Sequence, residues 1–497
     1  MKRLFLLFIL FQSGVLIAQD QNIFLDRDFW KTDPTVKTIK QKIKEGHDPA
    51  EKNDFGFDAI SYGLLDNISL PSLKYLLKQE GNPVTKPTHG GITYLLWAAY
   101  KGNVEAVNLL LDAGSDPMMA NSSGTNMLLM AAIGGVDNPA MYELILSQGI
   151  SKDYRNQSGA NALLLLSGSQ IENLKVFDYL LSKGFSLDSK DSDGNNLFSY
   201  AARGGSLEIM KMWQDKGVSY DGLNKKGENV VLFAAQGMKR RALRMEVFNY
   251  LTQDLDLEAD VVSWEGKTPL HYAARRAHKE LIQFLIEEGV STNQIDESGE
   301  LALFNAIGKD MEKLQLFVDL AKNINHANKD GHSALTRAIR WRSKESFDLL
   351  ISSGADAKIV DIENNNLLYH AFDAYRKRNE ETVAYFIDQL SNADIEAKGQ
   401  FAGGNTLAHI AVERQSPFLL KKALAMGVFI NTKNDLNLTP LHLAAMKATD
   451  NELLTLLVEN GADKKSRTDL DESAYDLAAQ NELLQENNVN YAILRLE

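Results

Sequence analysis

The nine residues 266–274, GKTPLHYAA, decide the fold of this chain because the same order of residue types returns about every 33 residues. It returns most clearly at 437–445, as NLTPLHLAA. Thirteen copies open with a glycine, asparagine or aspartate, at Gly56, Gly91, Gly124, Gly159, Gly194, Gly227, Gly266, Gly299, Gly331, Asn364, Gly404, Asn437 and Asp471. These residue types enter the left-handed backbone conformation at least cost, so each copy is predicted to begin with a turn.

A residue suited to start a helix stands two positions after each turn residue. Twelve of the thirteen positions hold Asp, Asn, Ser or Thr, and Leu301 is the exception. The side-chain oxygen of these residues accepts a backbone N–H of the first helical turn. Pro269 and Pro440 follow at the first helical position, where a missing N–H costs nothing. Seven residues after the turn, eleven copies have alanine, which lets a neighbouring helix come close.

A second apolar stretch follows the first in each copy and ends near a glycine. Examples are residues 107–114, 281–289 and 453–461, which end at Gly114, Gly289 and Gly461. A glycine after an apolar stretch of this length is typical of a helix C-terminus. One unit is therefore a turn, a short helix, a second helix and a loop. Neither helix can bury its apolar face alone, so the units are expected to stack, each contacting only its neighbours.

With these elements in place, the unit resembles the ankyrin repeat, and the similarity covers residues 53–486. The resemblance implies an all-α fold, an ankyrin-repeat solenoid of about thirteen helix-turn-helix repeats with N- and C-terminal caps. A tetratricopeptide array has a similar period but lacks a left-handed turn that leads into an N-cap, and it stays a remote alternative. Repeats 6 and 10 are longer than the others, which predicts irregular stacking near residues 236–246 and 373–382.

The two ends of the chain differ from the array. Residues 1–18 place Lys2 and Arg3 before an apolar run, the pattern of a secretory signal peptide. Residues 19–52 are expected to form an N-terminal capping segment, in which Asp33 caps a helix that begins at Pro34 and ends at Lys44. The array of residues 53–486 is followed by a C-terminal tail, residues 487–497. We expect a periplasmic or secreted protein without membrane insertion, because the apolar run is too short for a span.

Composition excludes several classes of protein. The chain has 53 Lys and Arg against 66 Asp and Glu, a formal charge of −13, which argues against nucleic acid as a partner. Hydrophobic residues make up 44% of the chain, so it can bury a core. There is no cysteine, which excludes disulfides, thiolate nucleophiles and Cys-ligated zinc.

The histidines and the short motifs do not indicate chemistry. His271, His409 and His442 stand two positions before the alanine, where the resemblance implies a structural hydrogen bond to the neighbouring turn. The other histidines fall in different repeats without metal-ligand spacing along the chain, so we predict no metal and no cofactor. No phosphate-binding or nucleophile motif is complete. The chain is therefore predicted not to be an enzyme.

Positive charge recurs after the first helix of repeats 6 to 10. Fifteen basic residues occupy this window, and stacking would align them in a band, here called the basic band. Its members are Lys239, Arg240, Arg241, Arg244, Arg275, Arg276, Lys279, Lys309, Lys313, Arg340, Arg342, Lys344, Arg376, Lys377 and Arg378. The candidate partner-binding residues are Arg240, Arg241, Arg275, Arg276, Lys309 and Arg340, with Trp264 and Trp341 as apolar anchors. The alternative is a solvated helix edge whose charge is partly cancelled by acids such as Glu280, Asp310, Glu312 and Glu345.

The function that these features favour is an exported scaffold, a monomer that binds a protein partner through its turn tips and concave helix face. The basic band predicts a partner with an acidic surface, because opposite charge raises the rate of encounter. Two alternatives remain open. One is a cell-envelope accessory factor that supports an oxidative-stress enzyme, a role that the resemblance implies for some exported bacterial members. The other is a secreted effector that acts on another cell.

The leader generates a prediction about the mature chain. Cleavage is expected to leave a first residue near Gln19, outside the cytoplasm, because the apolar run of residues 4–11 is followed by small and then polar residues. N-terminal sequencing of the protein recovered from the culture medium or the cell envelope checks this. Retention of Met1 in that material would contradict it.

Overall fold

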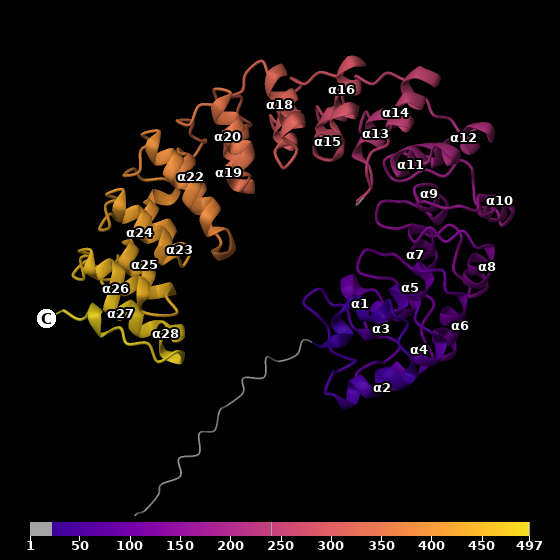
Figure 1. Ribbon diagram of the computed structural model, residues 1–497, viewed down its shortest axis with the longest axis horizontal. Helices are drawn as coiled ribbons and strands as arrows, with labels where there is room; N and C mark the ends of the chain where they lie inside the picture. Colours follow the sequence, from indigo (N-terminus) through magenta and orange to yellow (C-terminus); the bar gives the residue numbers. More distant parts are fainter. Residues whose placement is uncertain (1–21, 240, 497) are drawn as a thin grey trace, which may run out of the picture. The chain divides into compact units, whose positions relative to one another are not determined.

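The computed structural model describes residues 22–239 and 241–496 (Figure 1). The predicted signal peptide, residues 1–18, lies outside the described residues, and so does Arg240 of the basic band. The described part of the chain is helical, with isolated β-bridges but no strands. It divides into two compact units that meet in the sequence at Lys225 and Lys226. Each unit is a stack of helix pairs, which confirms the predicted all-α, helix-turn-helix solenoid.

In the first unit, five repeats each contribute a first and a second helix that lie side by side (Figure 1). The first helices are α3 (Ala59–Leu65), α5 (Tyr94–Tyr100), α7 (Met127–Ile133), α9 (Ala162–Ser167) and α11 (Leu197–Gly204). The second helices are α4 (Leu70–Leu76), α6 (Val104–Asp112), α8 (Pro139–Ser147), α10 (Lys175–Ser182) and α12 (Leu207–Asp215).

The second unit continues the pattern with eight repeats. The first helices are α13 (Val230–Gln236), α15 (Pro269–Arg276), α17 (Ala302–Ala306), α19 (Ala334–Trp341), α21 (Leu367–Asp373), α23 (Leu407–Glu413), α25 (Pro440–Lys447) and α27 (Ala474–Gln480). The second helices are α14 (Met245–Asn249), α16 (Lys279–Glu287), α18 (Met311–Leu320), α20 (Lys344–Ser352), α22 (Glu380–Asn392), α24 (Pro417–Ala425), α26 (Glu452–Glu459) and α28 (Glu482–Glu486).

The predicted turns set the start of every first helix. All thirteen turn residues have positive φ, between 56° at Asn437 and 96° at Gly194. The residue two positions later is the N-cap of a first helix in all thirteen repeats, and even Leu301 takes this place, without a side-chain bond. The turn residue therefore fixes where each first helix begins.

A polar side chain three positions before the turn residue closes most of the tips, although repeat 11 has Phe401 in this place. Asp361 is an example: its Oδ1 accepts the backbone N–H groups of Glu363 at 2.9 Å and Asn365 at 2.8 Å. Neighbouring tips are joined by backbone hydrogen bonds, such as that from Ile362 N–H to the carbonyl of Asp330 at 3.1 Å. Where a tip is held in both ways, its side chains keep a fixed spacing from those of the next tip.

Small residues let the first helices of neighbouring repeats approach closely. The alanines seven positions after the turn, such as Ala98, Ala131, Ala338 and Ala444, are fully buried. The approach is tightest at Gly134, which ends α7: a Cβ placed there would lie 1.9 Å from the carbonyl oxygen of Tyr100 in α5. The core therefore runs along the row of first helices and depends on the size of these residues.

The two long repeats are irregular where this was predicted. In repeat 6, α13 ends at Gln236 and α14 begins only at Met245, and α14 then continues into a π-helical turn, Tyr250–Asp254. In repeat 10, a 3-10 turn, Lys377–Asn379, precedes α22, which has 13 residues. The extra residues thus follow the first helix and lengthen its connection to the second helix.

The N-terminal segment folds against repeat 1, but its helix starts later than predicted. Helices α1 (Arg27–Trp30) and α2 (Val36–Lys44) pack on α3 and α4, respectively. The prediction that Asp33 is the N-cap was wrong: Thr35 caps α2, while Asp33 has positive φ and accepts the backbone N–H of Ser69. The Asp33 side chain thus forms a hydrogen bond to repeat 1, whereas the local sequence predicted that it caps its own helix.

Residues 487–496 follow the last repeat and fold back onto it. Leu494 is buried, and the Nζ of Lys464 donates to the carbonyl of Arg495 at 2.8 Å. The 3-10 turn Ala492–Leu494 packs on α26 and α27. Across residues 22–239 and 241–496, no helix combines the length and the apolar composition that a bilayer span requires.

The close approach at Gly134 generates a stability prediction. Gly134→Ala is expected to lower the free energy of unfolding by about 1–3 kcal/mol, because a methyl group there overlaps the Tyr100 carbonyl and α7 must move. Chemical denaturation followed by circular dichroism measures the change. Gly308→Ala is the control, since a Cβ at Gly308 meets no atom within 4 Å. Equal stability of the two variants would contradict the packing argument.

Candidate functional site

Most described members of the basic band lie at or just after the C-terminal ends of first helices in the second unit, whereas Lys279, Lys313 and Lys344 lie in the first turns of second helices. Arg275 and Arg276 occupy the last turn of α15, Arg340 the last turn of α19, and Lys309 follows α17. This is the end of a helix where unpaired carbonyl groups give a partial negative charge, so cations are stabilised there. A structural reason for the basic residues therefore exists beside the functional one.

Several members of the basic band cap the helices of neighbouring repeats. Arg276 donates to the carbonyl of Gln236 at 3.0 Å, and Arg342 donates to the carbonyl of Ala374 at 3.0 Å. Lys313 is buried, and its Nζ donates to the carbonyl of Ala277 at 3.2 Å. Burial lowers the pKa of both Lys313 and Arg342. These three cations stabilise the stack, and Lys313 presents no charge to a partner.

Other members of the basic band remain at the surface. Arg275, Lys309 and Arg340 are exposed. The guanidinium of Arg275 lies 5.9 Å from the centre of the Trp341 ring, and that of Arg337 lies 5.2 Å from it. Within residues 22–239 and 241–496, Arg275, Arg276 and Arg340 form no ion pair, whereas Lys279 pairs with Glu312 at 3.2 Å. The binding-surface interpretation thus fits the unpaired exposed cations, and the solvated-edge interpretation fits the cations that are paired with acids.

The two tryptophans have different surroundings. Trp341 lies among arginine side chains and is 44% exposed. Trp264, at a turn tip and 67% exposed, instead covers Gly227 of the preceding tip, where a Cβ would lie 2.7 Å from its ring. Arg241 lies with a guanidinium nitrogen 3.7 Å from the sulfur of Met238. The structure therefore joins Trp341, but not Trp264, to the exposed cations.

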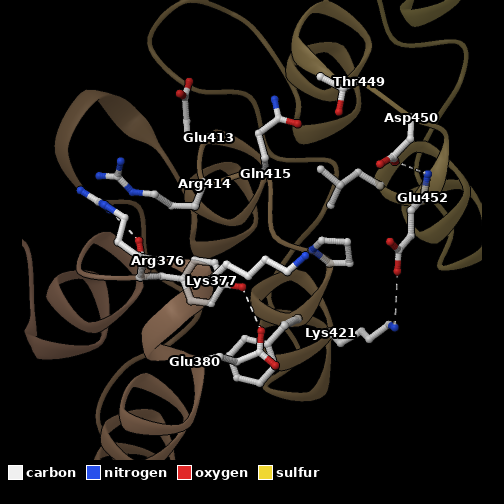
Figure 2. A pocket seen from close by; sticks show the side chains of 14 residues that line it. Arg376, Lys377, Glu380, Glu413, Arg414, Gln415, Lys421, Thr449, Asp450 and Glu452 are labelled. Atoms are coloured by element: carbon white, nitrogen blue, oxygen red, sulfur yellow. Dashed lines mark hydrogen bonds and ion pairs between the residues drawn. The ribbon is translucent and has the colours of Figure 1, made fainter. Parts of the chain in front are cut away.

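A groove of about 750 Å³ crosses repeats 10 to 12 (Figure 2). It is lined by Tyr375, Arg376, Lys377, Glu380, Glu413, Arg414, Gln415, Pro417, Phe418, Lys421, Thr449, Asp450, Glu452 and Leu453. The guanidinium groups of Arg376 and Arg414 lie at one end, and the carboxylates of Asp450 and Glu452 lie at the other (Figure 2). Arg414 is paired with Asp373 and Glu452 with Lys421, so of these four side chains Arg376 and Asp450 are the two without an ion pair among the described residues.

The floor of the groove is aromatic. Tyr375 and Phe418 stack with their ring centres 6.0 Å apart, and the Tyr375 hydroxyl donates to Glu380 at 2.9 Å. Burial raises the pKa of Tyr375, so the hydroxyl stays protonated at neutral pH. Lys421 lies 4.0 Å from Glu452 on the wall. A stacked aromatic pair beside charged side chains suits a protein partner, because aromatic residues and arginine dominate interface affinity.

Sequence reasoning identified two residues of this groove as basic, Arg376 and Lys377, and missed its other members. The long step between α21 and α22 opens the groove, because it moves the start of α22 away from the end of α21. The length of repeat 10 was visible in the sequence, but Phe418 and Asp450 come from the next two repeats. Their position depends on the stacking and could not be read from spacing alone.

The three histidines of the repeat pattern bond to the next repeat. The Nε2 atoms of His271, His409 and His442 lie 3.1, 2.9 and 3.0 Å from the carbonyl oxygens of Glu300, Leu438 and Ser466. Their Nδ1 atoms accept the backbone N–H of the N-cap threonine. Burial lowers the pKa of each ring, which keeps it neutral.

Two other histidines are closer than the sequence suggested. His332 and His370 belong to different repeats, and the sequence analysis found no metal-ligand spacing between them. In the structure their ring centres are 5.1 Å apart, with Asp361 beside both. The spacing argument was therefore wrong for this pair, because it counted along the chain and not across stacked repeats.

Comparison with known proteins finds the family model for ankyrin repeats (three copies) on residues 58–156, 95–191, 198–296, 240–326 and 368–468. Human Rabankyrin-5 is 28% identical over 178 residues, which are 35% of this chain and 15% of that protein. The B-cell lymphoma 3 protein homolog of Mus musculus is 28% identical over 193 residues, 38% of this chain and 42% of that protein. The chain thus spans less than half the length of these relatives.

Among solved structures, the human ASB11 ankyrin repeat domain matches with 24% sequence identity and a TM-score of 0.38. The match covers 45% of this chain and 97% of that domain.

Stability measurements distinguish the members of the basic band that cap neighbouring helices from the members that only present charge at the surface. Arg276→Ala is expected to lower the free energy of unfolding by about 1 kcal/mol, because the Gln236 carbonyl loses its donor. Arg275→Ala, the matched control one residue earlier, is expected to change it by less than about 0.5 kcal/mol, since Arg275 donates no hydrogen bond to a neighbouring repeat within the described residues. Urea denaturation of both variants gives the comparison. A larger loss in Arg275→Ala than in Arg276→Ala would reverse this assignment.

Proposed function

The chain belongs to the ankyrin repeat family, and we propose that it is a scaffold that binds a protein partner in the groove of repeats 10 to 12. The observation that carries the proposal is the stacked pair of Tyr375 and Phe418 between ends of opposite charge. Aromatic residues and arginine supply most of the affinity in protein interfaces. No catalytic role is part of the proposal.

The groove specifies the chemistry of the bound segment. An apolar side chain of the partner packs on Tyr375 and Phe418, and an acidic side chain pairs with Arg376 or Lys377. A basic side chain at the far end of the segment meets Asp450 and Glu452. The charge pattern thus sets the direction in which the segment lies, because the reverse direction places like charges together.

The exposed cations of the basic band attract the partner as it approaches, before the two proteins are in contact. Arg275, Lys309 and Arg340 carry positive charge on a chain with a formal charge of −13. Charge concentrated against the overall sign attracts an acidic partner surface and raises the rate of encounter. Trp341 is the apolar anchor of this patch, and Trp264 is not part of it.

We propose further that the protein works as a monomer outside the cytoplasm. The support for export is the signal-peptide pattern of residues 1–18. The partner is then a protein of the cell envelope or of the surroundings. The accessory-factor and effector alternatives differ only in which of these compartments holds it.

Site-specific photocrosslinking tests the groove as the binding site. A photoreactive phenylalanine analogue at position 418 is expected to crosslink the partner in living cells, and mass spectrometry identifies it. Phe418→Ala and Lys377→Glu are then expected to weaken the affinity for the purified partner at least about tenfold. Arg275→Glu with Arg340→Glu is expected to slow association and to reduce its dependence on salt.

Lys74→Glu is the matched control, because Lys74 is an exposed lysine on α4, in the first unit. It should leave affinity and association rate unchanged. Circular dichroism confirms that each variant keeps its helix content. If Phe418→Ala and Lys377→Glu bind the partner as the unmodified protein does, the groove is not the binding site.

A further inference from the structure

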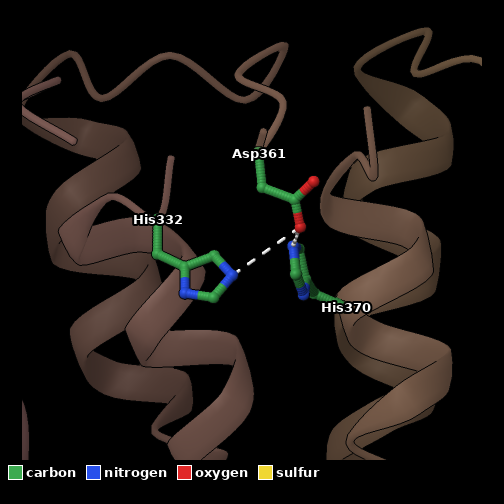
Figure 3. A group of neighbouring side chains, drawn as sticks. All are labelled: His332, Asp361 and His370. Carbon is green, nitrogen blue, oxygen red and sulfur yellow. Dashed lines mark ion pairs between the residues drawn. The ribbon is translucent and has the colours of Figure 1, made fainter. Parts of the chain in front are cut away.

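Three side chains of repeats 9 and 10 converge on one point (Figure 3). His332 follows the turn residue Gly331, Asp361 lies in the next tip, and His370 lies on α21. The Oδ2 atom of Asp361 lies 3.1 Å from His370 Nε2 and 3.6 Å from His332 Nε2. One ligand atom from each of the three residues lies within 4.8 Å of the other two.

These distances fit a tetrahedral zinc ion. Zinc bonds of roughly 2.0–2.1 Å to nitrogen and oxygen place neighbouring ligand atoms about 3.3 Å apart. The two distances to Asp361 Oδ2 lie on either side of that value. Two imidazole nitrogens and one carboxylate oxygen form a ligand set that zinc and related transition metals take in proteins.

An unsatisfied nitrogen points to a ligand. The His370 side chain is 5% exposed, and its Nε2 atom lies 3.1 Å from Asp361 Oδ2 without the alignment of a hydrogen bond. Leaving a buried polar nitrogen without a hydrogen bond is costly. A metal ion uses the lone pair of such a nitrogen and removes that cost. Repeat 5 shows the ordinary use of the same position, where the Tyr200 hydroxyl donates to Asp191 at 3.0 Å.

A neighbouring amide holds the Asp361 carboxylate in place. Asn365 Nδ2 donates to Asp361 Oδ2 at 3.0 Å, as second-sphere groups do at metal sites. The backbone N–H groups of Glu363 and Asn365 bind the other carboxylate oxygen, Oδ1, which leaves Oδ2 facing the two histidines.

A surface hollow of about 290 Å³ leads to His332 and supplies a path of entry. Asp330 lines it and adds negative charge, while Arg337 is neutralised there by its ion pair with Glu300. Arg340 opposes a cation: its guanidinium nitrogen lies 3.2 Å from Nδ1 and 3.3 Å from Nε2 of His332. Arg340 is exposed, so its side chain is free to turn into solvent when a metal binds.

We propose that His332, Asp361 and His370 bind one divalent transition-metal ion of the zinc type, with water from the hollow as the fourth ligand. The site joins the tip of repeat 9 to the tip and first helix of repeat 10. It lies outside the groove, but Arg340 and Trp341, which line the hollow, also belong to the patch of exposed cations that is proposed to attract the partner. The bound ion links the two repeats, and its water ligand leaves the fourth position open, unlike the closed four-residue sites of structural zinc.

Equilibrium dialysis of the untagged chain, stripped with a chelator, against Zn²⁺ tests the site. One zinc ion is expected to bind per chain, and Co²⁺ is expected to give the visible absorption of a tetrahedral complex. His332→Gln and His370→Gln should each weaken zinc binding by more than about tenfold, since loss of a second-sphere group alone costs that much. Arg340→Ala should strengthen it, because the competing cation is gone.

His278→Gln is the matched control, as His278 is an exposed histidine in the same unit. It should bind zinc as the unmodified chain does. His332→Gln decides the test if His370→Gln fails to fold, because His332 is only partly buried. Absence of saturable zinc binding, or equal binding by the unmodified chain and His332→Gln, would overturn the proposal.

Discussion

Every helix of the array depends on one backbone constraint, the left-handed residue that opens each repeat. Positive φ at thirteen turn residues, followed two positions later by an N-cap, gives all first helices the same start. Because the starts coincide, small buried residues lie along the first helices within each unit, and neighbouring tips can form hydrogen bonds. The stack therefore needs no contact between distant parts of the sequence. A bulky residue at the turn position would shift a helix and disturb both neighbours.

The same regularity explains why charge gathers at one side of the first helices in the second unit. Stacked helices present aligned rows of unpaired carbonyl groups, and long basic side chains reach across to them, as Arg276 and Arg342 do. The remaining cations at these ends, among them Arg275 and Arg340, have no acidic partner within the described residues. A band of basic residues in a repeat protein thus contains two populations. The two populations differ in whether their side chains form hydrogen bonds to the neighbouring repeat.

Much of the fold could be predicted from sequence, since the local signals recur: the turn residue thirteen times, the cap residue twelve times and the alanine eleven times. The N-cap of α2 could not, because Asp33 and Thr35 are both capping residues and the choice was made by Ser69, on another repeat. The aromatic floor of the groove and the meeting of His332 with His370 were missed for the same reason. In each case stacking of the repeats brings the residues together. Their separation along the chain matches no known motif and therefore does not predict the contact.

The tips divide the residues of each repeat into positions that carry the architecture and positions that are free to change. The residue directly after the turn is His332 in repeat 9 but Lys267, Glu300 or Leu438 elsewhere, and the position of His370 holds Tyr, Trp, Met or Leu in other repeats. Single substitutions at these positions can therefore introduce new side-chain chemistry while the fold is kept. Selection for a new specificity needs only two compatible changes on adjacent tips, which makes such arrays readily adaptable.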